Sequence, residues 1–430
     1  MSNIWGYGMS IGLLAACVPA EPEFPEPEDW ATRGPGGPQM SFQSEELLEH
    51  CAYLTGGPED IEHHNLVVMH DGYLLMPWAP EDAGGGITFF EFDDPCQPVK
   101  VGEAYAEGMR ESHSMAFGRV GEREYLAVDY QIADDTGGIG FWDVTDPTDP
   151  LWVSQLELPD YSYPDAYFRV ALATFWQGDY LYVSAGLNGI FVVDVTDPLS
   201  PELLHQHREV GHLVGSFHLI GNIGLSSSAG LAQAFLYDMT DPLGFAPIAG
   251  GDWLAQDSEG GQANYYFANT GGKYALFARK DTGGGPVIYD LSSEGGPQFV
   301  GDVNQEDADG GYVFRQNSPL FQGESNFSAI YDFSDPAQPT ELHRIELTGD
   351  LDTLTPIGNV AIASVDNGAQ SGQSTAVVPW TKDPDCTGPS AELTSPSSGA
   401  LWVDLSSRIG LSFDEMLEPR SVHSGSLRVW

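Results

Sequence analysis

The chain has 430 residues, with 63 Asp and Glu against 16 Lys and Arg, which gives a formal net charge of −47 at pH 7. A negative charge of this size repels nucleic acids and anionic lipids, so we expect neither as a partner. The hydrophobic fraction of 41% and the aromatic fraction of 11% exclude a wholly disordered chain and are sufficient for a large folded body.

The first 17 residues have the features of an export signal that ends in a lipid anchor. The apolar stretch at residues 9–17 is too short to span a bilayer, and its end, Leu-Ala-Ala-Cys, resembles a bacterial lipobox. In this interpretation Cys17 carries lipid after cleavage. Residues 1–16 contain no Lys or Arg, which departs from the usual basic start of such signals. We expect a protein of the bacterial cell envelope, at the outer membrane or cell surface, that contacts the membrane only through its lipid.

Residues 18–42 form an acidic, Pro-rich segment of extended character, which we interpret as a tether. The folded body is predicted to follow at residues 43–388. Its first strand is predicted at residues 45–51, Glu-Glu-Leu-Leu-Glu-His-Cys, because that run is similar to the strand expected after Pro201, Glu-Leu-Leu-His-Gln-His.

A ten-residue phrase then recurs through the body. It reads Gly-Ile-Thr-Phe-Phe-Glu-Phe-Asp-Asp-Pro at residues 86–95, and Gly-Ile-Phe-Val-Val-Asp-Val-Thr-Asp-Pro at residues 189–198. The anchoring acids recur at intervals of roughly 42 to 52 residues, at Glu91, Asp143, Asp194, Asp238, Asp290 and Asp332. Each phrase is typical of a strand buried on both faces, and its closing Asp-Pro predicts the strand end.

Hairpin signals precede the phrases, such as the Asp71-Gly72 pair between two apolar runs. Each repeat therefore predicts four strands, which is one propeller blade. The last repeat lacks a fourth strand and the first segment lacks three, so we expect the N-terminal strand to complete the last blade. The predicted fold is an all-β, seven-bladed β-propeller closed by this strand. An open array of hairpins would leave two exposed edges, so we disfavour it.

The phrase at residues 189–198 resembles the repeat of the LVIVD family of bacterial surface β-propellers, Gly-Leu-x-Ile-Val-Asp-Val-Ser-x-Pro. The resemblance extends over about residues 45–384. It implies an extracellular module, and the family is known chiefly without an assigned reaction.

Residues 389–430 no longer follow the repeat. The run that includes Ser412-Phe-Asp-Glu-Met-Leu-Glu-Pro-Arg-Ser-Val resembles the first half of a bacterial Ig-like domain of the SbsA type. We therefore expect a partial Ig-like β segment here, since a complete sandwich needs about 100 residues. The alternative is an unrelated strand pair packed on the propeller.

Export permits disulfides, and three cysteines remain if Cys17 carries lipid. Cys96 and Cys386 follow the phrases of the first and last blades, which are neighbours in a closed ring. A Cys96–Cys386 disulfide is our first expectation and Cys51–Cys386 the second, with three unpaired thiols as the remaining alternative.

Candidate ligands lie in loops that precede the first strand of a blade. His64, His113 and His212 are predicted to occupy equivalent positions of the innermost strands near the axis, where imidazoles suit a transition metal such as zinc, copper or iron. The ordinary alternative is that each histidine bonds to nearby backbone.

Gly-rich acidic loops on the same rim are candidates for calcium, although none has a complete EF-hand pattern. The acidic residues are Asp82, Asp134, Asp135, Asp281, Asp307 and Asp309. Solvated turns are the ordinary alternative. Calcium and a transition metal are therefore both open as cofactors.

No nucleophile elbow or phosphate loop is present, so an enzyme is the less favoured interpretation. We expect a monomeric binding or scaffolding module of the cell surface whose partner is an unidentified extracellular protein or glycan. The alternative is a metal-dependent hydrolase or oxidoreductase with its site at the propeller mouth, and an adhesive protein with calcium-stiffened loops is a third hypothesis.

Overall fold

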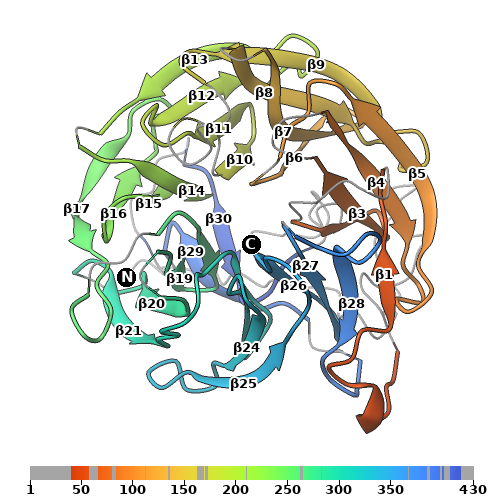
Figure 1. Ribbon diagram of the computed structural model, residues 1–430. Helices are drawn as coiled ribbons and strands as arrows, with labels where there is room; N and C mark the ends of the chain where they lie inside the picture. Colours follow the sequence, from red (N-terminus) through yellow and green to blue (C-terminus); the bar gives the residue numbers. More distant parts are fainter. Residues whose placement is uncertain are drawn as a thin grey trace, which may run out of the picture.

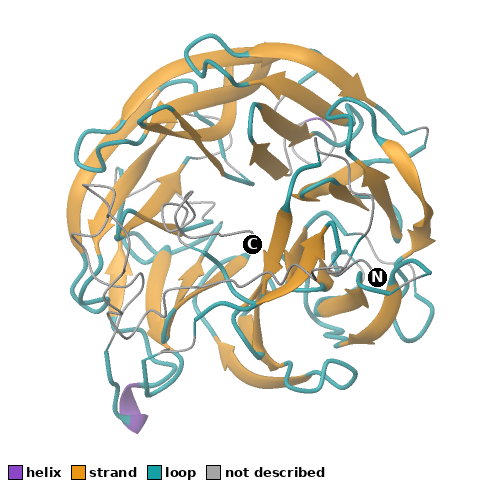
Figure 2. Cartoon of the chain, turned by 180° about the vertical axis from the view of Figure 1, so that it is seen from behind, coloured by secondary structure: helices purple, strands orange, loops and turns teal. Residues whose placement is uncertain are grey.

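Strand pairing in the computed structural model gives a closed ring of seven four-stranded antiparallel sheets, the blades of a β-propeller, together with a separate two-stranded sheet (Figure 1). Seen from behind, the ring consists almost wholly of strands and loops (Figure 2). The structure describes residues 40–57, 66–79, 84–111, 113–133, 136–161, 169, 173–209, 211–261, 265–281, 283–293, 295–366, 368–384, 388–397, 400 and 407–417.

The first six blades each use four consecutive strands, from the innermost to the outermost. Blade one comprises β2 (Val68–His70), β3 (Tyr73–Trp78), β4 (Gly85–Glu91) and β5 (Val99–Ala106). Blade two comprises β6 (Ala116–Val120), β7 (Arg123–Ala133), β8 (Thr136–Asp143) and β9 (Leu151–Leu158). Blade three comprises β10 (Ala173–Gln177), β11 (Tyr180–Ser184), β12 (Ile190–Asp194) and β13 (Glu202–His207). Blade four comprises β14 (Val214–Ile220), β15 (Ile223–Ser228), β16 (Gln233–Asp238) and β17 (Ala246–Leu254). Blade five comprises β18 (Ala268–Gly271), β19 (Tyr274–Ala278), β20 (Pro286–Asp290) and β21 (Gln298–Asp302). Blade six comprises β22 (Val313–Arg315), β23 (Pro319–Gly323), β24 (Ser328–Asp332) and β25 (Thr340–Ile345).

The seventh blade takes strands from both ends of the propeller sequence. Its inner three strands are β26 (Thr353–Ile357), β27 (Val360–Ser364) and β28 (Thr375–Pro379), and its outermost strand is β1 (Ala52–Leu54). Leu54 lies opposite Thr375 and Ala52 opposite Val377 in an antiparallel pair. In Figure 1 the orange-red β1 accordingly lies beside the blue β28.

The segment that leads into β1 is not the strand expected at residues 45–51. Ser44–Glu46 forms a 3-10 helix, η1, in which the Gln43 N–H donates a 2.7 Å hydrogen bond to the Glu46 carboxylate and the Glu46 N–H donates to the Gln43 carbonyl. Leu48 then has a φ of +66°, which a strand does not allow. The strand prediction was therefore wrong in position, because this local capping competes with extended pairing until Cys51.

The repeated apolar strand is buried on both faces because each blade is covered by two neighbours. In β12, Phe191 and Val193 pack toward blade two, whereas Ile190 and Val192 pack toward blade four. Buried side chains of the described residues form seven apolar clusters, and each joins two adjacent blades. This explains why the phrase is nearly continuous in hydrophobicity rather than alternating.

A disulfide links Cys51 and Cys96, with the two Cα atoms 5.1 Å apart. Both expected pairings with Cys386 were therefore wrong, and Cys386 itself lies outside the described residues. Cys51 directly precedes β1, the outer strand of blade seven, and both cysteines pack on the cluster shared by blades seven and one. The predicted junction is thus the correct one, but the partner on blade seven is the N-terminal segment.

The C-terminal segment forms a two-stranded sheet of β29 (Ala391–Ser395) and β30 (Gly410–Phe413), near the middle of the ring in Figure 1. It packs against the turns between the first two strands of blades five and six. The Gly272 N–H donates to the Phe413 carbonyl, the Asn317 N–H donates to the Asp414 carbonyl, and Arg315 forms a two-pronged ion pair with Glu392. A partial Ig-like segment was expected here. The described residues of this segment form one pair of strands, which packs on the propeller. Within the described part of the chain, no helix has the length and hydrophobicity needed to cross a membrane.

Candidate functional site

The loops that carry the predicted ligands emerge on one face of the ring, which we call the loop face. Successive strands of a blade alternate in direction. The lead-in loop before each innermost strand and the loop between the second and third strands therefore leave from the same end. In a propeller such loops bear the variable chemistry while the blades hold them in place.

His113, in the lead-in loop of blade two, reaches blades five and six instead of lining its own blade. Its Nε2 lies 3.2 Å from Glu111 Oε1, and its ring stacks on Phe267 at 6.2 Å between centroids. The Tyr312 hydroxyl donates a 2.6 Å hydrogen bond to the His113 carbonyl. The Lys280 ammonium lies 5.8 Å from the centre of the Phe267 ring. We use the name mouth cluster for the five residues Glu111, His113, Phe267, Lys280 and Tyr312. It connects opposite parts of the ring across the loop face.

His212 remains within blade four. Its Nε2 lies 3.4 Å from Ser226 Oγ, and its ring meets Phe235 edge to face at 4.6 Å. Burial lowers the pKa of the imidazole to about 4, so the ring is neutral at physiological pH.

The prediction of equivalent histidines on the innermost strands was wrong for the two that can be checked. His113 and His212 precede β6 and β14 instead of lying in them. The contacts described above are with Glu111 and Phe267 for His113, and with Ser226 and Phe235 for His212. The reason is that loop conformation, and not strand register, decides where each ring points. His64 lies outside the described residues. Among the residues that the structure describes, no three His, Cys, Asp or Glu side chains are grouped so as to hold a metal ion.

Two calcium candidates, Asp281 and Asp309, lie together, and the carboxylate of Asp309 is paired with an ammonium group. Lys280 Nζ is 3.3 Å from Asp309 Oδ2, and the Asp281 N–H donates a 2.7 Å hydrogen bond to Asp309 Oδ1. Asp307 is exposed, and its carbonyl accepts a hydrogen bond from Asn326. A lysine therefore already pairs with the carboxylate of Asp309. Asp82, Asp134 and Asp135 lie outside the residues whose side chains are described, and Cys17 lies outside the described chain.

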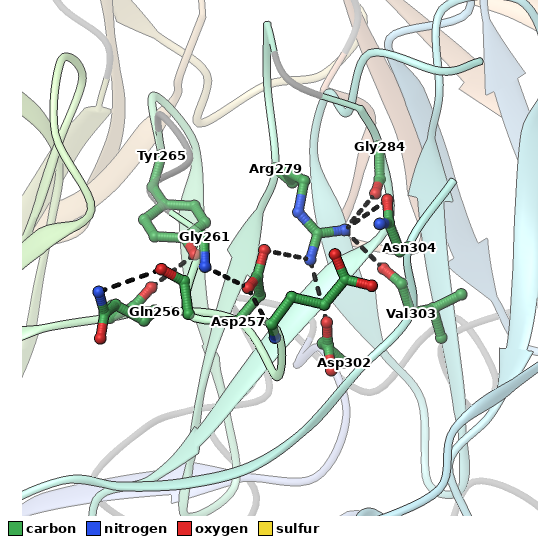
Figure 3. A network of polar contacts seen from close by, with 12 residues as sticks. Gln256, Asp257, Gly261, Tyr265, Arg279, Gly284, Asp302, Val303 and Asn304 are labelled. Atoms are coloured by element: carbon green, nitrogen blue, oxygen red, sulfur yellow. Dashed lines mark hydrogen bonds and ion pairs between the residues drawn. The ribbon is translucent and has the colours of Figure 1, made fainter. Parts of the chain in front are cut away.

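A buried arginine next to Lys280 organises the same region of the loop face. Arg279 is 1% exposed, and its Nη2 lies 3.3 Å from Asp257 Oδ2 and 3.1 Å from Asp302 Oδ2. Its Nη1 donates to the Gly284 and Val303 carbonyls at 2.8 and 2.9 Å. Figure 3 shows the guanidinium between the two carboxylates. One side chain thus ties the lead-in loop of blade five to its Gly-rich loop and to its outermost strand.

Glu324 extends this polar region to blade six. Its side chain is fully buried and accepts hydrogen bonds from the Gly285 N–H at 2.9 Å and from the Tyr331 hydroxyl. Burial raises the pKa of Glu324 to about 7, against the opposing effect of these donors and of Arg279 and Arg344. The Gly-rich loop of blade five is therefore fixed both to its own blade and to the next one.

Sequence reasoning missed the Arg279 network, although a signal was present. Arg279-Lys280-Asp281 places two of only 16 basic residues side by side at the start of a Gly-rich loop. In a chain with 63 acidic residues, adjacent cations at a strand end indicate paired, buried carboxylates nearby. The sequence could not identify Asp257 and Asp302 as the partners, because both pairings depend on the folded blade.

Comparisons with known proteins agree with this architecture. The LVIVD repeat family matches residues 176–207, which include most of blade three. No curated protein matches the chain. Similar solved structures include the WD40 β-propeller domain of Doa1, at 11% identity and a TM-score of 0.51, covering 78% of this chain and 97% of that one.

A protein from Lactobacillus plantarum is similar at 11% identity and a TM-score of 0.52, covering 71% of this chain and 99% of that one. A chain of the mitotic checkpoint complex is similar at 11% identity and a TM-score of 0.53, covering 79% of this chain and 98% of that one. At this level of identity the likeness shows the fold alone. Together with the blade-three match, it establishes a β-propeller that contains an LVIVD repeat.

Proposed function

We propose that this protein is a binding or scaffolding module held outside a bacterial cell by a lipid on Cys17. The main support for this proposal is that the loops of the loop face are held in place on a propeller that contains an LVIVD repeat. Buried ion pairs and hydrogen bonds fix its loops between blades five and six, and the mouth cluster joins blade two to them. Loops held in this way offer a preorganised surface, which lowers the entropic cost of binding a partner.

Two observations support an extracytoplasmic location. The Cys51–Cys96 disulfide is of a kind that forms and persists in oxidising compartments. The lipobox-like end at Cys17 and the acidic, Pro-rich residues 18–42 precede the propeller in the order anchor, tether and body.

The net charge limits the partner. With 63 acidic and 16 basic residues, the protein favours neutral or basic groups over anionic ones. An extracellular protein with a basic surface and a neutral glycan both satisfy this condition.

The anchor is tested by replacing Cys17→Ser in a native host. We expect the protein to move from the membrane fraction to the soluble fraction, because a single thiol carries the whole anchor. Cys386→Ser, which removes a thiol that takes no part in the Cys51–Cys96 disulfide, is the matched control and should leave the protein in the membrane fraction.

The released Cys17→Ser protein then tests the module itself. It should rebind to washed cell-envelope material in a saturable way, since its propeller is unchanged. Membrane retention of Cys17→Ser would contradict the anchor. Loss of all saturable binding, with a propeller that still unfolds normally, would contradict the binding function.

A further inference from the structure

A groove at the outer edge of the loop face, between blades six and seven, is lined mainly by polar and aromatic side chains. Its volume is about 400 Å³, within the range of about 300–1,000 Å³ that is usual for small-ligand sites. Its polar and aromatic walls come from three separate segments and comprise His50, Tyr53, Glu346, Thr348, Gln370 and Gln373.

The aromatic wall belongs to the strand that completes blade seven. The rings of Tyr53 and His50 lie 4.6 Å apart at an angle of 37°. Tyr53 is half-buried and packs, with Leu347 and Trp380, on the apolar cluster between blades six and seven. Tyr53 also lines the groove, so its ring is supported by the blade from behind.

The facing wall supplies neutral hydrogen-bonding groups. Gln370 and Gln373 are exposed at the loop between β27 and β28, and the Gln373 N–H donates a 2.8 Å hydrogen bond to the Gln370 carbonyl. Each amide offers donors and an acceptor, and the Thr348 hydroxyl offers both. Such groups match sugar hydroxyls, each of which also donates and accepts.

Charge narrows the ligand class further. The described residues that line the groove include one carboxylate, Glu346, and no Lys or Arg. An anionic ligand would meet Glu346 and no Lys or Arg among these residues, on a protein whose net charge is −47. An aromatic ring suits the C–H faces of a pyranose, because it presents flat apolar area beside polar groups.

We infer that this groove binds a neutral sugar unit of an extracellular glycan, seated on Tyr53 and hydrogen-bonded by Gln370, Gln373 and Thr348. The inference rests on the proposed binding function and names the ligand class for it. The glycan can be free or attached to a protein, since the groove contacts only the sugar.

The test is titration of the full chain with neutral di- to tetrasaccharides of glucose, galactose, mannose and N-acetylglucosamine, by calorimetry and ligand-observed NMR. At least one series should bind, and Tyr53→Ala should weaken it by about tenfold or more, since lost stacking and contact area amount to about 1.4 kcal/mol or above. Tyr53→Phe keeps the aromatic face and should retain most of the affinity. Tyr105→Ala, at a tyrosine that is 59% exposed on blade one, is the matched control and should change nothing.

The double variant Gln370→Ala, Gln373→Ala keeps the proposal testable if Tyr53→Ala impairs folding, because both amides are exposed. It should also weaken binding without lowering stability. The inference is overturned if no neutral saccharide binds at 10 mM, or if binding is unaffected by the groove variants. Saturable envelope binding that survives all groove variants would remove the sugar site while leaving the binding module in place.

Discussion

In several blades, an aspartate at the end of the repeated strand accepts hydrogen bonds that fix the turn after it. In the phrase Asp-Val-Thr-Asp-Pro of blade three, Asp194 Oδ1 accepts hydrogen bonds from the Thr196 N–H and hydroxyl, and Asp197 Oδ1 accepts one from the Leu199 N–H. The same bonds recur at Asp143, Asp238 and Asp290, with a threonine or serine two residues on. The Thr196 hydroxyl and N–H lower the pKa of Asp194, so this turn remains bonded down to acidic pH. The acid therefore recurs because it satisfies backbone groups where the strand ends.

Glu324 is the opposite kind of residue, an acid whose charge the fold disfavours. It is buried between Gly285 and Tyr331, and the charged groups that act on it are Arg279 and Arg344. Its pKa of about 7 in the folded protein exceeds its ordinary value of 4.5. Between these two values the folded state binds more protons than the unfolded state does.

We predict that this residue makes the protein less stable as the pH rises. Its stabilising contribution is complete below pH 4.5 and is lost as the pH rises through about 7. Within that window the free energy of unfolding should fall by about 1.4 kcal/mol per pH unit, or about 3 kcal/mol in total. Glu324→Gln, which does not titrate, should remove this part of the slope. The measurement is urea unfolding of both proteins from pH 4.5 to 8.

The control is Glu341→Gln on the same blade. Arg344 lowers the pKa of Glu341, so that residue contributes stability above its unfolded pKa and loses it on acidification. Its replacement should leave the fall between pH 4.5 and 7 in place. Parallel pH profiles for the parent and Glu324→Gln would show that Glu324 titrates normally.

Among the elements, the junction between blades seven and one is held by a covalent link as well as by strand pairing. β1 contributes only three residues to blade seven, so its backbone pairing is short. The Cys51–Cys96 disulfide holds the segment before β1 to the turn that follows β4. Pairing and disulfide therefore act on the same junction, where the two ends of the propeller sequence meet.

We predict that removing the disulfide is among the most destabilising changes in the loops. It closes a 45-residue separation, for which the chain-entropy relation gives about 4 kcal/mol. The double variant Cys51→Ser, Cys96→Ser should lose up to that amount in denaturant unfolding, and the parent should lose as much after complete reduction. A fully reduced parent, verified by thiol titration, that unfolds at the original midpoint would show that β1 alone closes the ring.

The elements also show which features a sequence of this kind can predict. The blade count and the third strands follow from a phrase repeated in consecutive blades, because the same local chemistry recurs in each. The disulfide partner, the directions of His113 and His212 and the Arg279 network occur once each, in loops. They depend on contacts such as that of His113 with Tyr312, 199 residues apart, which no local pattern encodes. The error at residues 45–51 has a similar origin, since η1 there obeys its own capping residues.

In the molecule as a whole, many basic side chains are paired with acidic ones, whereas most acidic side chains have no basic partner. Many of the described cations are committed to local pairs, including Arg279 with Asp257 and Asp302, Lys273 with Asp290, and Arg315 with Glu392. With 16 basic residues against 63 acidic ones, most surface carboxylates have no counter-charge within the chain. Their mutual repulsion disfavours the compact state, and dissolved salt screens it.

We therefore predict that the midpoint of thermal unfolding rises steadily with NaCl between about 0.01 and 1 M, as the screening length shortens from about 30 to 3 Å. KCl should give the same curve, because screening depends on ionic strength rather than on the identity of the monovalent cation.

Calcium chloride separates screening from specific binding. At matched ionic strength it should add nothing if the acidic loops only repel one another. A marked rise at about 1 mM calcium, removed by a chelator and by Asp309→Asn, would instead show a calcium site on the loop face. A midpoint that is flat or falls with NaCl would show that carboxylate repulsion does not limit the stability of this propeller.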